Sequence, residues 1–68
     1  MQKNREKTRS FLIDARRKKG YKQFEVAWAV GVSPGAYSNI EVGIRNPSVK
    51  LAKKIGEFLE FEWTRFFE

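Results

Sequence analysis

Residues 23–41 read QFEVAWAVGVSPGAYSNIE, and this stretch decides the fold that we expect for the chain. Val26 and Val30 lie four residues apart, on one face of a helix that stops at Gly31. Phe, Val and Trp would also suit a strand, but the two alanines and the glycine stop favour the helix. A second helix begins sharply at Ser33-Pro34, because Ser caps the first-turn amides and Pro at the first helical position lacks only an N–H that would stay unpaired.

The two helices and their connection meet the requirements of a helix-turn-helix. Ala27 is small enough to lie where two helices cross closely, and Gly31 supplies the left-handed backbone of the turn. Apolar residues then fill the angle between the helices: Val26, Val30, Val32, Tyr37 and Ile40. In this motif the second helix stands out from the body and enters the DNA major groove.

Three more short helices are expected around this unit. One runs from about Lys7 to Lys19 and ends at Gly20, and another follows the N-cap Ser48 with an apolar stripe over residues 49–59. A last turn covers residues 62–67. The sequence therefore predicts an all-α fold of five short helices in a single domain over residues 1–68, with residues 1–6 either extending the first helix or forming a flexible basic arm.

The aromatic side chains of the last turn belong to the expected core. Helical spacing on a terminal turn indicates packing more often than a cofactor or membrane site. We expect two of Trp63, Phe66 and Phe67 to dock near Phe11 and Ala15, and the third to serve a dimer contact.

Composition excludes several classes of protein. The 68 residues include no Cys and no His, which excludes a disulfide, a zinc finger and the Ser-His-Asp and Cys-His nucleophile arrangements. Glu25 and Glu41 lack a matching base, nucleophile or metal-ligand set, so we expect no enzyme, no metal and no cofactor. No apolar run approaches the roughly 18 residues of a membrane span, and we expect a cytoplasmic protein that does not bind membranes.

Charge is unevenly distributed along the chain. The formal net charge is +6, from fourteen Lys and Arg against eight Asp and Glu. Residues 1–56 carry thirteen of the basic and four of the acidic side chains, whereas residues 57–68 carry one and four. Such a chain presents a positive surface to a polyanion, although a solvated basic face that aids solubility would have the same composition.

The run RRKKGYKQFEVAWAVGVSPGAYSNIEVGIRNPS, residues 16–48, resembles the Cro/phage-repressor (XRE-type) helix-turn-helix, which has a lambda-repressor-like fold. The resemblance extends over about residues 9–67. Five features match in order: Arg16 with Gly20, Gln23 with Ala27, GVS at 31–33, S-x-IE-x-G at 38–43 and R-x-PS at 45–48. The resemblance implies binding of double-stranded DNA.

The resemblance also implies roles for four matched residues. Arg16 is expected to pair with Glu41 as a structural ion pair. Gln23 is expected to meet a DNA phosphate from the start of its helix. Arg45 is expected to reach the DNA backbone or minor groove, against the alternative of an exposed loop charge.

The recognition helix departs from the family pattern near its start. Relatives often place Gln, Arg or Lys where this chain has Pro34, Gly35 and Ala36, none of which can donate a bidentate bond to a base. Ala36 offers a methyl contact to thymine if it faces outward. The polar candidates are Ser33, Ser38, Asn39 and the Tyr37 hydroxyl, the last as a phosphate ligand. Asn39 is the leading candidate because Asn can bond both N6 and N7 of adenine, and solvent exposure without a DNA role is the alternative.

Phe24 and Trp28 are a second departure, since the family usually carries polar residues on that face. If Val26 and Val30 point inward, both rings should be at least partly exposed. An exposed aromatic pair marks a protein interface, with a second subunit or a regulatory partner. Covering of the pair by residues 1–8 is the alternative.

Taken with the resemblance, these features predict a sequence-specific DNA-binding transcriptional regulator of phage-like type. We expect a repressor that binds a two-fold operator as a homodimer, on half-sites about 34 Å apart. The alternative is a protein-interaction module on the same fold, such as an antitoxin-like or antirepressor component, which would use Phe24 and Trp28.

Overall fold

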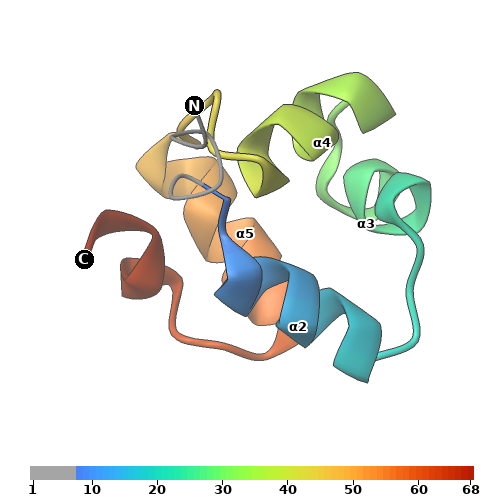
Figure 1. Ribbon diagram of the computed structural model, residues 1–68, viewed down its shortest axis with the longest axis horizontal. Coiled ribbons are helices and arrows are strands. Elements are labelled where there is room, and N and C mark those ends of the chain that lie inside the picture. The colour runs from blue at the N-terminus through green and yellow to red at the C-terminus, as the bar shows by residue number, and fades with distance from the viewer. Residues whose placement is uncertain (1–7) are drawn as a thin grey trace.

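Four α-helices and a closing 3-10 helix follow one another in the computed structural model, which describes residues 8–68 (Figure 1). They are α2 (Ser10–Lys18), α3 (Gln23–Val30), α4 (Pro34–Glu41), α5 (Val49–Leu59) and η1 (Trp63–Phe67). No strand occurs in this described part, so the all-α prediction is confirmed, with a 3-10 helix as the fifth element. The predicted arm, residues 1–6, lies outside the described residues.

Capping side chains begin α4 and α5 where the sequence predicted them. The Ser33 hydroxyl accepts a hydrogen bond from the Ala36 N–H at 3.1 Å, and Ser48 accepts one from Leu51 at 3.1 Å. Helix α2 is shorter than the helix expected over residues 7–19, since it begins at Ser10 and ends at Lys18. Both caps follow from the preference of Ser oxygens for unpaired first-turn amides.

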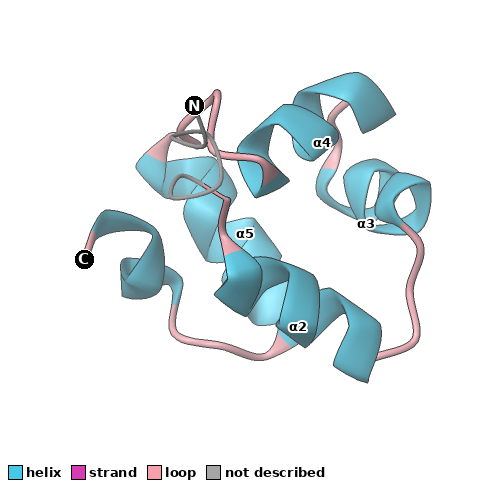
Figure 2. Cartoon of the chain, in the orientation of Figure 1, coloured by secondary structure: helices cyan, strands magenta, loops and turns pink. Residues whose placement is uncertain are grey.

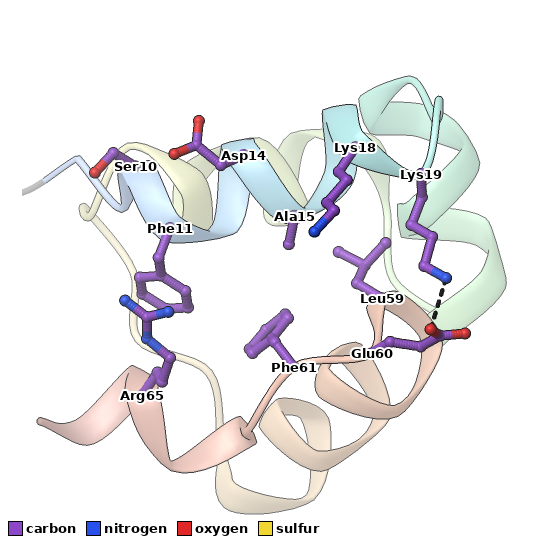
Figure 3. Close-up of a pocket in the computed structure, with 10 residues that line it drawn as sticks. All are labelled: Ser10, Phe11, Asp14, Ala15, Lys18, Lys19, Leu59, Glu60, Phe61 and Arg65. Carbon is purple, nitrogen blue, oxygen red and sulfur yellow. Dashed lines mark ion pairs between the residues drawn. The ribbon is translucent and has the colours of Figure 1, made fainter.

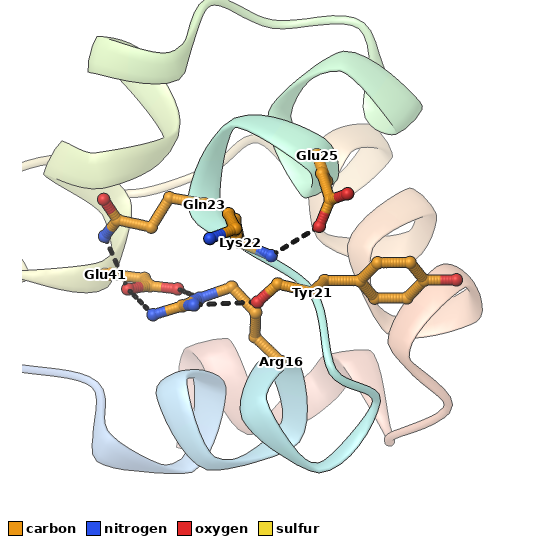
Figure 4. Close-up of polar contacts among 6 residues, drawn as sticks. All are labelled: Arg16, Tyr21, Lys22, Gln23, Glu25 and Glu41. Carbon is orange, nitrogen blue, oxygen red and sulfur yellow. Dashed lines mark hydrogen bonds and ion pairs between the residues drawn. The ribbon is translucent and has the colours of Figure 1, made fainter.

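The start of α3 is stabilised by Glu25, for which the sequence predicted no structural role. Lys22 precedes the helix, and its side chain offers no capping acceptor. The Glu25 carboxylate instead accepts a hydrogen bond from the Lys22 N–H at 2.7 Å (Figure 4). In capping boxes the Glu at the third helical position accepts this hydrogen bond from the backbone N–H of the N-cap residue. One unpaired N–H at the start of α3 is therefore satisfied without Ser or Thr at the N-cap.

The helix-turn-helix occupies one side of the molecule, and short loops join the helices (Figure 2). The turn between α3 and α4 begins at Gly31, whose φ of 83° lies in the left-handed region. Helix α5 packs behind α3, and η1 folds back on α5. The core contains ten buried apolar side chains: Leu12, Val26, Ala27, Val30, Tyr37, Ile40, Ala52, Ile55, Leu59 and Phe66. Four of the five apolar residues predicted to fill the angle between α3 and α4 are buried, and the fifth, Val32, is half-buried. That prediction is confirmed.

The C-terminal aromatic residues pack differently from our expectation. Phe66 docks on Phe11 with ring centroids 5.4 Å apart, as predicted. The second ring on Phe11 belongs to Phe61, also at 5.4 Å, a contact that the sequence did not predict. Two of the three terminal aromatic residues were expected there, and only Phe66 contacts the Phe11 ring. The backbone and Cβ of Trp63 lie against Gly56 of α5, and Phe67 is exposed. The chain after α5 therefore turns back so tightly that Trp63 faces α5.

No helix within residues 8–68 combines the length and apolar character that crossing a bilayer requires.

Gly56 permits this tight return, and replacing it with alanine tests the packing. A Cβ at Gly56 would lie 2.8 Å from the Phe61 carbonyl oxygen and 3.0 Å from the Trp63 Cβ, so Gly56→Ala should lower the free energy of unfolding by about 1–3 kcal/mol. Gly35→Ala is the matched control, because a Cβ there meets open space and should stabilise α4 by up to about 1 kcal/mol. Urea denaturation followed by circular dichroism measures both. Equal effects of the two substitutions would contradict the proposed close contact.

Candidate nucleic-acid interface

Helix α4 has a buried side and an outward side. Tyr37, Ile40 and Glu41 face the core. The opposite side of the helix carries Gly35 and Asn39, both exposed, and α4 lies at the outer edge of the molecule (Figure 1). The helix therefore projects its outer face as a recognition helix requires.

The predicted DNA-contacting residues differ in their accessibility. Five are exposed: Ser33, Pro34, Gly35, Asn39 and Arg45. Gln23, Ala36 and Ser38 are half-buried. The exposed group surrounds the start and outer face of α4 and the loop that follows it, so these residues share one side of the domain.

Tyr37 was wrongly predicted as a phosphate ligand. Its side chain is fully buried in the core, and its hydroxyl makes no hydrogen bond within the described structure. Burial, together with the neighbouring Glu41 carboxylate, raises the pKa of Tyr37 far above its usual range. Apolar spacing with Ile40 had placed the ring inward, and that part of the prediction is confirmed. The hydroxyl cannot reach a duplex from this position.

A buried ion pair connects α4 to α2. Arg16 Nε donates to Glu41 Oε2 at 2.6 Å and Arg16 Nη2 donates to Oε1 at 3.3 Å (Figure 4). The side chains are 12% and 1% exposed, respectively. The predicted pair of Arg16 and Glu41 is confirmed, and its two parallel bonds fix the orientation of both side chains.

Gln23 joins the same network from the first turn of α3. Its Nε2 donates to Glu41 Oε1 at 2.8 Å (Figure 4). The carboxylate of Glu41 therefore connects α2, α3 and α4. One amide N–H of Gln23 is committed to this contact, which leaves the second amide N–H and the first-turn backbone for the predicted phosphate contact.

The charge on Glu41 depends on these donors. Burial by itself would raise the pKa of Glu41, but hydrogen bonds from Arg16 and Gln23 outweigh it, and the pKa lies below the usual glutamate value. The carboxylate is accordingly ionised in the folded domain at neutral pH. Its negative charge is neutralised locally by the Arg16 guanidinium rather than left facing the DNA.

Arg9 holds the C-terminal end of α4, a role that the sequence analysis missed. Its Nη1 donates to the Ile40 and Arg45 carbonyl oxygens at 2.7 and 3.1 Å, and its Nη2 donates to Asn46 Oδ1 at 2.6 Å. Its backbone N–H bonds the Glu41 carbonyl at 2.7 Å. Partial burial lowers the pKa of this guanidinium, which still complements the negative end of the helix dipole.

Arg45 is positioned beside the recognition helix. The N–H groups of Ile44 and Arg45 both donate to the Asn39 carbonyl, at 3.0 and 3.1 Å. Arg45, Ala36 and Ser48 line one shallow hollow between α4 and the start of α5. A cation is thus held next to the exposed face of α4 by the loop that Arg9 fixes.

The aromatic pair of α3 is exposed, as predicted. Phe24 is 41% and Trp28 66% exposed, and their rings meet edge to face with centroids 5.1 Å apart. The alternative, covering by residues 1–8, falls almost entirely on residues outside the described part of the chain.

The pKa of Glu41 predicts how stability changes with pH. Because the folded pKa lies below the unfolded one, the unfolded chain binds more protons in acid, and the stabilisation from Glu41 present at neutral pH is lost as pH falls below about 4.5. Glu41→Gln should cost roughly 3 kcal/mol at pH 7 and reduce the dependence of stability on acid. Urea unfolding between pH 7 and pH 3 measures this.

Glu60→Gln is the control, because Glu60 forms an exposed pair with Lys19 at 2.8 Å. This substitution should change stability at pH 7 little. An unchanged acid dependence in Glu41→Gln would show that Glu41 does not control it.

Comparison with known proteins agrees with this geometry. A family model described as helix-turn-helix matches residues 12–66. The chain is 50% identical over 60 residues to the uncharacterized HTH-type transcriptional regulator YqaF of Bacillus subtilis (strain 168), covering 88% of this chain and 79% of YqaF. It is 43% identical over 54 residues to the HTH-type transcriptional regulator SlrR of the same organism, covering 78% of this chain but 36% of SlrR. No solved structure matches. The chain belongs to the XRE-type helix-turn-helix family of DNA-binding transcriptional regulators.

Proposed function

We propose that this regulator is a repressor that binds a two-fold operator as a homodimer, with α4 in the major groove. The observation that carries the proposal is the outward face of α4, held by the Arg16–Glu41 pair and flanked by Arg45. A domain of this size covers few base pairs, so two copies on half-sites about 34 Å apart supply the remaining contacts. This role involves no catalysis or cofactor, and it places the protein in the cytoplasm with its DNA.

Affinity comes mainly from the phosphate backbone in this proposal. Gln23 and the first-turn amides of α3 contact one phosphate, and Arg45 contacts the backbone or minor groove beside α4. The exposed start of α4, at Ser33 and Pro34, allows the backbone to approach the duplex closely.

Sequence readout is limited by the side chains of α4. Asn39 is the exposed amide on the outward face and pairs with adenine, while Ser38 and the Ala36 methyl supply weaker contacts at its edges. Gly35 contributes no side chain. Specificity is therefore modest and relies partly on DNA shape and bridging water.

A second candidate function is a protein contact through Phe24 and Trp28. The supporting observation is the exposure of both rings on α3. Such a contact serves either a second subunit or a regulatory partner, as in an antitoxin-like or antirepressor component.

Binding to randomised duplexes at two or more salt concentrations tests the DNA-binding proposal. With about five phosphate contacts, the logarithm of the association constant should fall with the logarithm of salt with a slope of about −4 to −5. Arg45→Gln should weaken binding to all sequences and reduce that slope by about 1, whereas Asn39→Ala should relax selection at one base position by about 1–3 kcal/mol.

Lys54→Gln is the matched control, since Lys54 is exposed on a different hollow, beside Ala29 and Glu57. It should leave the slope nearly unchanged. Absence of salt-dependent binding to any duplex would overturn the proposal, and equal effects of Arg45→Gln and Lys54→Gln would remove Arg45 from the interface.

Trp28→Glu tests the protein contact. A charge at the centre of an apolar interface should reduce the mass of the associated species in light scattering, or abolish a partner's retention in pulldown, without lowering the melting temperature. Val49→Glu is the control, because Val49 is an exposed apolar residue of α5 rather than α3. An unchanged mass together with unchanged partner retention would defeat the hypothesis.

A further inference from the structure

A groove of about 570 Å³ lies between α2 and the segment that follows α5 (Figure 3). Its walls come from residues 10–19 and 59–65, so neither helix of the helix-turn-helix contributes to it. The volume falls within the range of small-molecule sites, roughly 300–1,000 Å³. Nothing in the DNA-binding proposal uses this groove.

The floor of the groove is apolar. Phe11, Ala15, Leu59 and Phe61 line it, with the Phe11 and Phe61 rings edge to face at 5.4 Å. Ala15 lies between these larger side chains and opens the space, since its single methyl group leaves the middle of α2 unfilled (Figure 3). A flat apolar body fits against such a floor.

The charges that face the groove are cationic. Lys18 extends over the floor near Leu59, and the Arg65 guanidinium lies 4.8 Å from the centre of the Phe11 ring (Figure 3). Asp14 also lines the groove, with its carboxylate directed away from the Phe61 ring (Figure 3). Lys19 and Glu60 neutralise each other at 2.8 Å (Figure 3). An apolar floor beneath two cations selects a ligand that is apolar at one end and anionic at the other.

We propose that this groove binds a small amphipathic carboxylate, aliphatic or aromatic. Its apolar body lies on Ala15 and Phe61, and its carboxylate pairs with Lys18 at the open edge. Arg65 contributes the second positive charge from η1. We propose an anionic ligand because Lys18 and Arg65 both line the groove. A neutral or cationic ligand of the same size would form no ion pair with these two side chains.

Titration of the full chain with octanoate, at submicellar concentration, tests the proposal by calorimetry and by NMR shifts of the Ala15 methyl and Phe11 ring. Octanol and octyltrimethylammonium have the same apolar length. Octanoate should bind and shift both signals, whereas the cation should not and the alcohol should bind roughly fivefold more weakly, the contribution of a partly exposed ion pair. Equal binding of all three would overturn the assignment of an anion.

Two variants locate the site. Ala15→Leu should fill the groove and abolish octanoate binding, and Lys18→Gln should weaken it roughly fivefold. Lys50→Gln, on an exposed lysine of α5 outside the groove, is the matched control and should change nothing. Because Lys18→Gln alters a surface side chain, it remains informative if Ala15→Leu fails to fold.

Two other outcomes would overturn the proposal. Octanoate binding that survives Ala15→Leu would place the ligand elsewhere. A loss of self-association in folded Ala15→Leu, without octanoate binding by the parent chain, would assign the groove to a second copy of the chain. Duplex binding, measured on the same samples, keeps this proposal separate from the DNA-binding one, since either can fail alone.

Discussion

The Glu41 carboxylate is the constraint on which the recognition helix depends. It is almost fully buried in the last turn of α4, where the helix dipole is negative, so an ionised carboxylate there is doubly unfavourable. Arg16 and Gln23 supply three hydrogen bonds that offset this cost. The Arg9 guanidinium places a second cation on the Ile40 carbonyl of the same turn. The end of α4 is therefore stable only while α2 and its preceding residue are docked against it.

The same network determines how α3 and α4 are oriented. Gln23 attaches the start of α3 to Glu41, while Ala27 and the left-handed Gly31 permit the close crossing and the turn. Polar contacts at one end and small residues at the other leave the two helices little freedom to change their angle. A small domain has few apolar contacts to spare. The buried hydrogen bonds of Arg16, Gln23 and Glu41 thus fix the orientation of α3 and α4, which apolar packing would fix in a domain with a larger core.

Local rules were sufficient to predict much of the fold, and long-range contacts account for what was missed. The caps at Ser33 and Ser48 and the turn at Gly31 depend on neighbours within a few residues, so their sequence positions reveal them. Arg9 was missed because its partners lie 31 to 37 positions away, and no periodic pattern links them. Two predictions for Tyr37 conflicted, since its spacing indicated burial and its hydroxyl indicated a contact with DNA. The structure shows burial, because the ring packs in the core between α3 and α4.

Helix α2 connects the two surfaces on which the proposals rest. Arg16, with Arg9 just before the helix, faces α4 and the loop of Arg45, whereas Phe11, Ala15 and Lys18 line the groove. The face of α2 toward α4 carries hydrogen-bond donors for buried oxygen atoms of α4. The face of α2 toward the groove carries the apolar side chains of Phe11 and Ala15. Helix α2 is therefore shared by the groove and by the hydrogen-bond network that holds the end of α4.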